Sequence, residues 1–413
     1  MIEEILTFEE VRKYLKISKS KLYQLTQQKK IPVTKIGRTW RFKLSKIDAW
    51  LNGNKQEGLT ANLIDKASLE IPEIGLNTPG LSLRTKLKLY KRRADKIEQY
   101  LSKKPEEWGK FQSELNSEVN DIFRDIMNFE KINFSNNNEE KLYKLKGIFI
   151  NKIRKLFLKG AYNEWSLRKP LGYAGDFKII DDIYQNTPYT TGIERLFDNY
   201  FMMSAISEAV RNRKEDFKHL IIGFINSCKN RPLRIMNLAC GPCREIKEIF
   251  ESNKLINKDI IFDCYDHEKK ALEYAKGLLN GFKKINFIHK NILKLSTTKN
   301  IDSYIKERYD FIYSAGFFDY LGHRMSVRLV KNLRNILNKD GFLVISNVRD
   351  KYSNPSVHYM EWVGEWNLVY RSDEEFKKIF LDARFKEDDL KIQYEQQGIM
   401  QYIIACNTVK NIK

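Results

Sequence analysis

The chain has 413 residues, of which 42% are hydrophobic and 12% aromatic, so it is long and apolar enough to form two or three packed domains. The formal net charge of +20 suits nucleic acid, an anionic membrane surface or an acidic substrate, and does not choose among them. Five unevenly spread cysteines exclude a disulfide scaffold, while the lack of a long apolar run and the acidic start MIEEILTFEE predict a cytoplasmic protein without a transmembrane segment or signal peptide.

Residues 1–53 are predicted to form a small helical unit with a hairpin. The stretch Thr7-Phe-Glu-Glu10 fits a capping box, in which Thr and Glu satisfy each other's backbone at a helix start. Ser18 is a suitable N-cap for a second helix over residues 19–26. Two short strands follow in IPVTKIGRTWRF, hinged at Gly37, and Ser45 caps a last helix.

This order of elements predicts a winged helix-turn-helix, and residues 1–55 hold thirteen Lys or Arg against five Asp or Glu. The unit, with KIGRTWRF before a capped helix, resembles the excisionase-type DNA-binding domain. The resemblance implies that the second helix faces the major groove of duplex DNA and that the hairpin contacts phosphate or the minor groove. The implied residues are Ser18, Lys19, Ser20, Lys21, Tyr23, Lys35, Arg38, Thr39 and Arg41.

A protein-interaction or dimerisation module remains the alternative for this unit. A single copy reads one half-site, so specific DNA binding predicts a homodimer. Residues 54–84 mix Gly, Pro, Asn and Ser without periodicity and are predicted to be a linker. Residues 85–228 have a charged helical pattern, which indicates a helical cap or lid region or, equally, a dimer interface.

Residues 229–413 alternate apolar runs with amphipathic stretches. The runs are LRIMNLA, IIFDCYD, INFIHKN, YDFIYSA and GFLVISNV. Strands that alternate with helices predict a parallel α/β sheet of the Rossmann-like, doubly wound class. Ligands of such sheets bind beyond the carboxyl ends of the strands, so the candidate site lies there.

The first run ends in NLACGPCREI, which contains the pair Cys240 and Cys243. A structural zinc needs four ligands, and no second C-x-x-C or paired His lies nearby, so no metal site is expected. A redox pair remains an alternative. A small-residue turn around Gly241 also lets backbone N–H groups approach a cofactor, and Asp266 ends the next run where an acid suits ribose hydroxyls. We prefer the cofactor-turn interpretation, because a redox pair does not explain the acid at the end of the next strand.

Residues 230–350 resemble a class I S-adenosylmethionine-dependent methyltransferase. The resemblance implies S-adenosyl-L-methionine as the cofactor, with the methionine end near the first turn, the ribose at Asp266 and the adenine near His267. Two departures from the family pattern are Asn237 and Asn291, which stand where the family usually has an acid. The implied cofactor-binding residues are Asn237, Ala239, Cys240, Gly241, Pro242, Asp266, His267, Asn291, Ile292, Ser314, Ala315 and Phe317.

Two flanking segments, RKPLGYAGDF and HYMEWVGEWNLVYR, are rich in polar and aromatic residues and are candidates for the acceptor site. Together with NLACGPCREI and GFFDYLGHR, they resemble the methyltransferases that make hydroxy-fatty-acid methyl ester signals, over residues 165–405. The resemblance implies a carboxyl acceptor, held by Arg371 or His323, and a lid organised by Tyr173 and Asp176. A structural role is as open as a site role for five of these candidates, Tyr173, Asp176, Glu361, Tyr370 and Arg371, and His323 is the sixth candidate.

Three functions follow from these patterns. The first is a methyltransferase for a small-molecule or fatty-acid-type acceptor, with an appended DNA-binding module. The second is a DNA-binding regulator whose methyltransferase-like half senses S-adenosylmethionine or a metabolite. The third, a nucleic-acid methyltransferase, is disfavoured because SAGFFDY stands where an amino-methylating DNA enzyme presents N-P-P-Y or D-P-P-Y.

Overall fold

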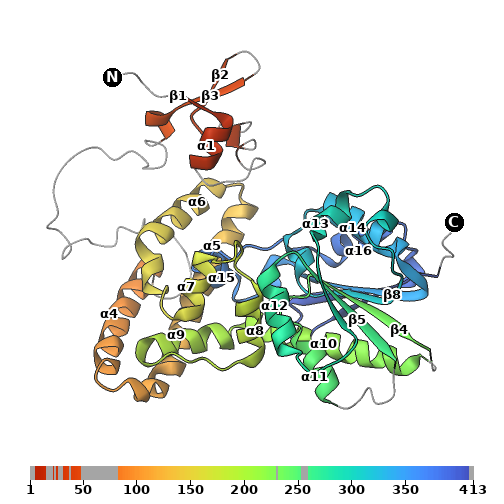
Figure 1. The fold of residues 1–413 in the computed structure, drawn as a ribbon. Coiled ribbons are helices and arrows are strands. Elements are labelled where there is room, and N and C mark those ends of the chain that lie inside the picture. Colours follow the sequence, from red (N-terminus) through yellow and green to blue (C-terminus); the bar gives the residue numbers. More distant parts are fainter. Residues whose placement is uncertain are drawn as a thin grey trace. The chain divides into compact units, whose positions relative to one another are not determined.

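In a computed structural model of the chain, the structure describes residues 5–14, 22, 25–26, 31–36, 39–47, 82–228, 231–252 and 259–408 (Figure 1). The chain divides into two compact units, Met1–Ser68 and Leu69–Lys413. Within the described residues, no helix has the length and apolar character that a membrane span requires.

The first unit is built on a small antiparallel sheet. Its elements are β1 Ile5–Thr7, α1 Phe8–Tyr14, β2 Thr34–Ile36 and β3 Thr39–Lys43, with the strand order β1-β3-β2. The predicted hairpin is confirmed, because Thr34 pairs with Arg41 and Ile36 with Thr39. Strand β1 was not predicted. It pairs with the other edge of β3, where Leu6 lies opposite Phe42.

The start of α1 has the predicted capping box. The backbone N–H of Thr7 donates to Glu10 Oε2 at 2.7 Å, and the backbone N–H of Glu10 donates to Thr7 Oγ1 at 3.4 Å. Residues 44–47 are helical, which bears out the last predicted helix, but this helix already includes Leu44, so Ser45 is not its N-cap. Of the predicted second helix, only Leu22, Leu25 and Thr26 lie within the described residues, and they are helical. The core of the unit consists of Leu6, Val11, Leu22, Ile31, Phe42 and Ile47.

The second unit begins with helices. They are α4 Leu83–Leu101, η1 Pro105–Phe111, α5 Gln112–Ser135, α6 Glu139–Ile148, η2 Phe149–Ile153, η3 Arg154–Leu156, α7 Ala161–Arg168, α8 Phe177–Gln185, α9 Gly192–Met203 and α10 Ala205–Ser227. Helix α4 shows why this charged sequence folds: its buried residues include Leu83, Leu87, Tyr90 and Ala94, which recur every three or four positions and form one apolar stripe.

The rest of this unit is a seven-stranded sheet with helices. The strands are β4 Leu233–Leu238, β5 Ile260–Asp266, β6 Ile285–His289, β7 Tyr309–Ser314, β8 Leu337–Val348, β9 Leu390–Tyr394 and β10 Met400–Cys406. The main helices are α11 Arg244–Glu251, α12 Lys269–Leu278, α13 Ile292–Thr297, α14 His323–Asn335, α15 Val357–Trp362 and α16 Asp373–Asp382. The strand order is β6-β5-β4-β7-β8-β10-β9.

Strands β4 to β8 are the five predicted parallel strands. Successive side chains of each strand face opposite sides of the sheet. Ile235, for example, packs with the cluster that contains α10, α11 and α12, whereas Met236 packs with the cluster of α13, α14 and α16. Figure 1 shows α10 and α11 on one side of the sheet and α13, α14 and α16 on the other. This is the predicted Rossmann-like, doubly wound α/β fold.

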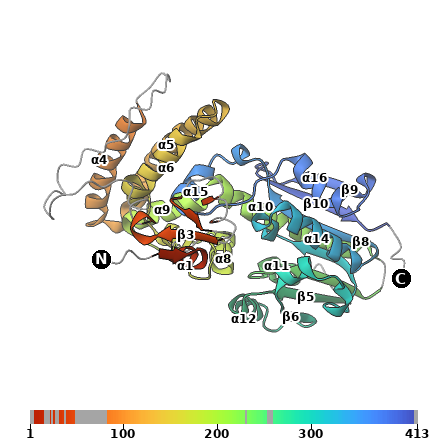
Figure 2. The ribbon, with the colours of Figure 1, turned by 90° about the horizontal axis from the view of Figure 1, so that it is seen from above.

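The helical region predicted as a cap shares the first of these two clusters. Leu87 of α4, Phe123 of α5 and Phe217 of α10 belong to the same buried cluster as Ile235 of β4. In both ribbon views α8 lies beside α12 (Figures 1 and 2), and the Tyr274 hydroxyl of α12 bonds to Asp181 of α8 at 2.5 Å. The helices therefore share one core with this face of the sheet.

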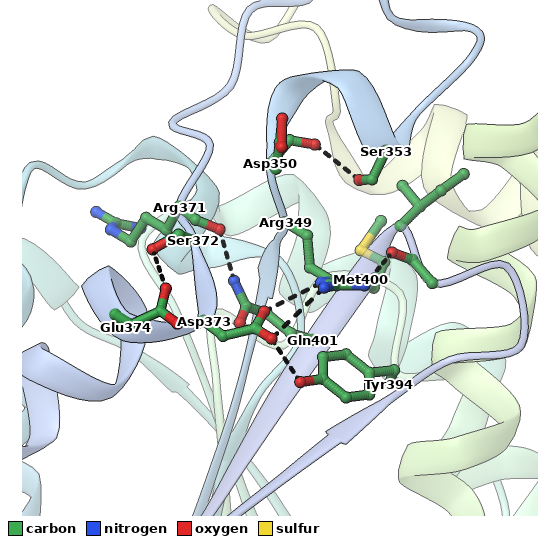
Figure 3. Close-up of polar contacts among 12 residues, drawn as sticks. Arg349, Asp350, Ser353, Arg371, Ser372, Asp373, Glu374, Tyr394, Met400 and Gln401 are labelled. Atoms are coloured by element: carbon green, nitrogen blue, oxygen red, sulfur yellow. Dashed lines mark hydrogen bonds and ion pairs between the residues drawn. The ribbon is translucent and has the colours of Figure 1, made fainter.

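Strands β9 and β10 were not predicted, and both run antiparallel to their neighbours. Strand β10 lies between β8 and β9. Polar contacts tie this hairpin to the end of β8 and the start of α16 (Figure 3): Arg349 Nε and the Tyr394 hydroxyl donate to Asp373 at 3.1 and 2.6 Å, and Gln401 Nε2 donates to the Arg371 carbonyl at 2.8 Å.

Candidate functional site

A cavity of about 260 Å³ lies at the carboxyl ends of β4, β5 and β7, where the α/β topology predicts a ligand. The sheet side supplies the turns after these three strands. The helical region and the segment after β8 supply the other walls. The lining residues are Tyr173, Gly175, Phe177, Ile180, Tyr184, Ile206, Val210, Arg213, Asn237, Ala239, Cys240, Gly241, Pro242, Glu245, Asp266, His267, Ala315, Gly316, Phe317, Asp319, Tyr320, Met360, Trp366, Leu368 and Met400.

The turn after β4 has an unusual backbone. Ala239, Gly241 and Cys243 have φ angles of 55°, 54° and 56°, in the left-handed region that residues with a side chain rarely adopt. Two non-glycine residues in this region store strain, which the surrounding fold must hold in place. The turn delivers the chain to the start of α11 at Arg244 and presents its backbone to the cavity.

Asp266, at the end of β5, is bonded directly to this turn. Its Oδ2 accepts the backbone N–H of Gly241 at 3.0 Å, and its Oδ1 accepts the backbone N–H of Glu268 at 2.9 Å. The neighbouring His267 is half exposed, and its hydrogen bond with Asp266 raises the pKa of the imidazole. Ribose-type hydroxyls and an aromatic base are the groups that such an acid and such a ring suit.

Asn237, Glu245 and Tyr313 form a buried polar chain beneath the turn. Glu245 Oε1 accepts from Asn237 Nδ2 at 2.9 Å and from the Tyr313 hydroxyl at 2.8 Å. Burial raises the pKa of Glu245 to about 7, and the Tyr313 hydrogen bond opposes part of this rise. Glu245 is therefore an acid at the cavity wall that changes charge near neutral pH.

The two cysteines of the turn lie in the protein interior. Cys240 and Cys243 are buried and free, and burial raises the pKa of both thiols well above the usual range. Protonated, buried thiols are unreactive. Among the residues that the structure describes, no group of three His, Cys, Asp or Glu side chains could hold a metal ion. The cofactor-turn interpretation of this motif fits the geometry better than the redox alternative.

The segment before α8 covers the cavity. A Cβ atom on Gly175 would lie 2.5 Å from the Tyr320 hydroxyl and from the Trp366 ring, so this close approach requires glycine. The Trp366 Nε1–H donates to the Tyr320 hydroxyl at 2.9 Å, and the Tyr173 ring meets the Tyr320 ring edge-on at 6.1 Å. These aromatic residues form one wall of the cavity.

An ion pair joins α8, which follows this covering segment, to α11, which follows the turn after β4. Arg244, which opens α11, pairs with the fully buried Asp181 of α8, and its Nη2 donates to Asp181 Oδ2 at 2.7 Å. The helix that follows Gly175 is thus attached to the helix that follows Gly241.

Nine of the predicted cofactor-binding residues line the cavity and three do not. Asn291 caps α13, where its Oδ1 accepts the backbone N–H of Leu293 at 3.0 Å. Ile292 is buried in the hydrophobic cluster of α13, α14 and α16. Ser314 is buried and donates to the Leu238 carbonyl at 2.9 Å. Each of these three side chains has a local structural role: one caps a helix, one packs in the core, and one bonds to the neighbouring strand.

Of the predicted catalytic residues, only Tyr173 lines the cavity. Asp176 is buried as the N-cap of α8 and accepts the Trp165 indole N–H at 2.7 Å. His323 is exposed at the start of α14 and lies 2.9 Å from Asp382. Both side chains face structural partners, so neither lies where an acceptor would be held.

The three other candidates also lie outside the cavity lining. Arg371 is buried, and its guanidinium donates to the carbonyls of Phe318 and Leu321, which leaves it no access to a ligand carboxylate. Glu361 pairs with Lys351 at 3.1 Å. Burial raises the pKa of the Tyr370 hydroxyl, and the neighbouring Glu361 carboxylate raises this pKa further.

Sequence reasoning missed several lining residues, above all Arg213, Tyr184, Glu245, Asp319 and Tyr320. Glu245 stands next to the recognised turn, and its place in the first turn of a helix was the one available signal. Arg213 lies on α10, well before the first sheet strand, and its sequence context is an ordinary charged helix.

Most of the predicted DNA-binding residues lie outside the part of the chain that the structure describes. Ser18, Lys19, Ser20, Lys21, Tyr23 and Arg38 lie outside the described residues, and Lys35 and Thr39 are described only as backbone in β2 and β3. Arg41 lies in β3, and its Nη1 donates to the Trp40 carbonyl at 3.0 Å.

Comparisons with known proteins bear on both units. Residues 5–55 match the family model described as a helix-turn-helix domain. The N-terminal unit is therefore a helix-turn-helix domain, while its excisionase type stays a prediction. A search of curated proteins gives no match.

Several solved structures are similar to the chain. A "possible exported protein" from Bordetella parapertussis shares 17% identity over 64% of this chain and 96% of that chain, with a TM-score of 0.49. Magnesium protoporphyrin IX methyltransferase from Synechocystis PCC 6803 shares 10% identity over 49% of this chain and 88% of that chain, with a TM-score of 0.37. The CurJ carbon methyltransferase shares 12% identity over 66% of this chain and 71% of that chain, with a TM-score of 0.43. All three scores lie below 0.5, so the fold assignment rests on the strand order of the chain itself.

Proposed function

We propose that the unit Leu69–Lys413 is an S-adenosylmethionine-dependent methyltransferase for a small-molecule or fatty-acid-type acceptor, and that the helix-turn-helix unit binds duplex DNA. One observation carries the proposal: the turn at Gly241 and the acid Asp266 are bonded together at the carboxyl ends of neighbouring parallel strands, on the wall of a cavity. The sequence resemblance to class I methyltransferases supports the same conclusion.

The residues at the cavity fit this cofactor. A carboxylate has about four lone-pair sites, so Asp266 can accept from ribose hydroxyls while it keeps its two backbone bonds. Glu245, whose pKa of about 7 leaves it partly ionised at neutral pH, supplies negative charge, and the rings of Phe317 and Tyr320 supply electron-rich faces, both of which suit a cationic ligand. When bound, the cofactor supplies an electrophilic methyl group. The protein's residues orient it, balance its charge and, through the covering segment, exclude water.

The acceptor side of the cavity favours an apolar molecule. Ile206, Val210, Met360, Leu368 and Met400 line it, which suits an acyl chain or another apolar group. A carboxylate acceptor is already anionic and needs no general base, whereas an alcohol needs one. O-methylation of a carboxylate is therefore our preferred reaction. We assign Tyr173 to the cavity wall and Asp176 to holding the start of the covering helix.

DNA binding is supported by the family match of residues 5–55 and by the basic hairpin that carries Arg41. The same match favours a second candidate function, a transcriptional regulator whose larger unit binds the cofactor as a signal. The cytoplasmic location and the homodimer stay predictions.

The decisive experiment incubates the purified chain with radiolabelled S-adenosylmethionine and separate lipid, small-acid, protein and nucleic-acid fractions of a cell extract. We expect label in the small-acid or lipid fraction. Label in the nucleic-acid fraction alone would exclude the proposed acceptor. Cofactor binding without transfer to any fraction would favour the sensing function.

Calorimetry with S-adenosylhomocysteine tests the cofactor site. Asp266→Ala is expected to weaken binding by roughly 10-fold to 100-fold, in the range for lost hydrogen bonds to a charged group. Asp259→Ala is the matched control. Asp259 lies just before β5, at the end of the strand opposite to Asp266, and its exposed side chain pairs with Lys284. No binding by the unchanged protein would defeat both candidate functions.

A further inference from the structure

Arg213 is a charged residue in an apolar place. It lies on α10, lines the cavity and is only 3% exposed. Removing a guanidinium from water is costly unless its N–H groups are bonded and its charge is balanced. The partners that the protein itself supplies decide whether a ligand is needed there.

Those partners leave the guanidinium incompletely bonded. Its Nη1 lies 3.6 Å from Asp319 Oδ2, which is beyond hydrogen-bond length, and 3.6 Å from the weakly accepting Met400 sulfur. A Tyr184 hydrogen bond adds support. The buried Nε has no hydrogen-bond partner among the residues that the structure describes.

Asp319 is not free to move closer. Its Oδ1 accepts the Asn347 side-chain N–H and the Val348 backbone N–H, both at 2.8 Å. Its carboxylate therefore balances the charge of Arg213 from a distance and leaves guanidinium donors for another acceptor.

The guanidinium is also held in one place and stays charged. A Cβ atom on Gly316, after β7, would lie 2.9 Å from Arg213 Nη1, so the side chain lies directly against that backbone. Burial alone lowers the pKa of Arg213, but Tyr184, Asp319 and Tyr402 raise it overall. A fixed cation whose Nε donor is unfilled thus stands at the β7 side of the cavity, away from Asp266 on β5.

We propose that Arg213 binds a carboxylate in this cavity. A planar guanidinium matches the two oxygens of a carboxylate. A phosphate is a poorer fit, because Asp319 already offsets part of the single positive charge. The inference rests on the proposed function, which offers two sources of this group: the amino-acid end of the cofactor, and an acid acceptor.

Two ligand pairs separate the sources. The first is S-adenosylhomocysteine against its decarboxylated analogue S-adenosyl-3-thiopropylamine, and the second is decanoate against decanamide. Calorimetry gives the affinity of the full-length chain for each. The variants are Arg213→Met, which removes the charge, and Arg213→Lys, which keeps it. The matched control is Arg211→Met, on the same helix but outside the cavity lining, where Arg211 donates to the Met202 carbonyl at 2.9 Å.

We expect Arg213→Met to weaken binding of the carboxylate member of one pair by roughly 10-fold to 150-fold, the range for hydrogen bonds to a charged group, and not to weaken binding of the member that lacks the carboxylate. Arg213→Lys should keep part of the preference, and Arg211→Met all of it. A loss confined to the first pair assigns Arg213 to the cofactor, and a loss confined to the second assigns it to the acceptor.

An equal loss for both members of each pair, or no change in either variant, would overturn the inference. A protein that binds neither carboxylate would overturn it too. Decanoate binding that depends on Arg213, in a protein that does not bind S-adenosylhomocysteine, would support the carboxylate site while defeating the proposed function. Melting temperatures of the variants show whether they fold, and Arg213→Lys keeps the test open if Arg213→Met does not.

Discussion

The backbone N–H of Gly241 donates a 3.0 Å hydrogen bond to Oδ2 of Asp266. The two residues belong to the turns after neighbouring parallel strands, and the carbonyl of Tyr265 reinforces the link by accepting the backbone N–H of Cys240 at 3.0 Å. The strained turn and the acid therefore hold each other in position before any ligand arrives. Such preorganisation is what a binding site needs if its groups are not to rearrange on each encounter.

The covering segment gives a first prediction. Gly175→Ala places a Cβ atom 2.5 Å from the Tyr320 hydroxyl and the Trp366 ring, so the cavity wall must shift. We expect lower cofactor affinity and slower methyl transfer, measured by calorimetry and label incorporation. Gly223→Ala is the control with the opposite expectation: it lies in α10 with open space around it, so it should stabilise by about 0.5–1 kcal/mol. Equal activity in both variants would show that the close approach at Gly175 has no role.

Glu245 gives a prediction on pH. Its pKa in the folded state is about 7, because it is buried, whereas in an unfolded chain a Glu has a pKa of about 4.3. Between these values the folded state binds the proton more strongly, so the free energy of unfolding falls as pH rises. Relative to Glu245→Gln, the unchanged protein should lose about 3 kcal/mol between pH 4.5 and pH 8, within the usual scale of such shifts.

Urea unfolding of the two proteins across this pH range measures the difference. Glu251→Gln, at the exposed end of the same helix, is the control and should keep the pH dependence of the unchanged protein. Parallel curves for the unchanged protein and Glu245→Gln would mean that Glu245 does not titrate in this window.

The thiols of the first turn give a third prediction. Cys240 and Cys243 are buried and burial raises the pKa of both, so they should react slowly with iodoacetamide in the native protein. Cys228 and Cys406 are partly exposed and serve as internal references. Mass spectrometry of alkylated peptides gives the four rates. Faster labelling at Cys240 or Cys243 than at the references would revive the redox interpretation of the C-x-x-C motif.

The DNA-binding proposal gives a fourth prediction. Arg41→Ala should weaken binding of the full-length chain to duplex DNA and lower the slope of log affinity against log salt by about 1, as the loss of one phosphate contact predicts. Gel shifts across a salt series measure both. Arg12→Ala is the matched control, because Arg12 pairs with Glu9 on α1 at 2.7 Å. An unchanged slope for Arg41→Ala would place the phosphate contacts elsewhere.

The sequence allowed the fold and part of the site to be predicted. Parallel strands buried on both faces read as continuous apolar runs, so β4 to β8 were recognisable. The turn around Gly241 and the acid Asp266 follow such runs directly. Strand β9, LKIQY, is a short strand at the edge of the sheet. It alternates polar and apolar residues, so it gave no comparable signal.

The functional side chains depended more on long-range packing. Arg371 looked like a ligand-binding cation, but its acceptors Phe318 and Leu321 lie about fifty positions earlier in the chain. Local patterns would have helped at Asp176, whose place before FKIIDDIYQ is that of an N-cap. Arg213 could not be found, because only the folded chain brings α10 against the backbone of Gly316.

The position of β10 bears on how the chain folds as it is synthesised. This strand is made after β9 and yet lies inside the sheet, between β9 and β8. Until residue 406 has left the ribosome, β8 has an open edge of unpaired backbone groups and β9 has no neighbour. Open apolar edges promote association between nascent chains. The larger unit therefore completes its sheet only after translation of this strand.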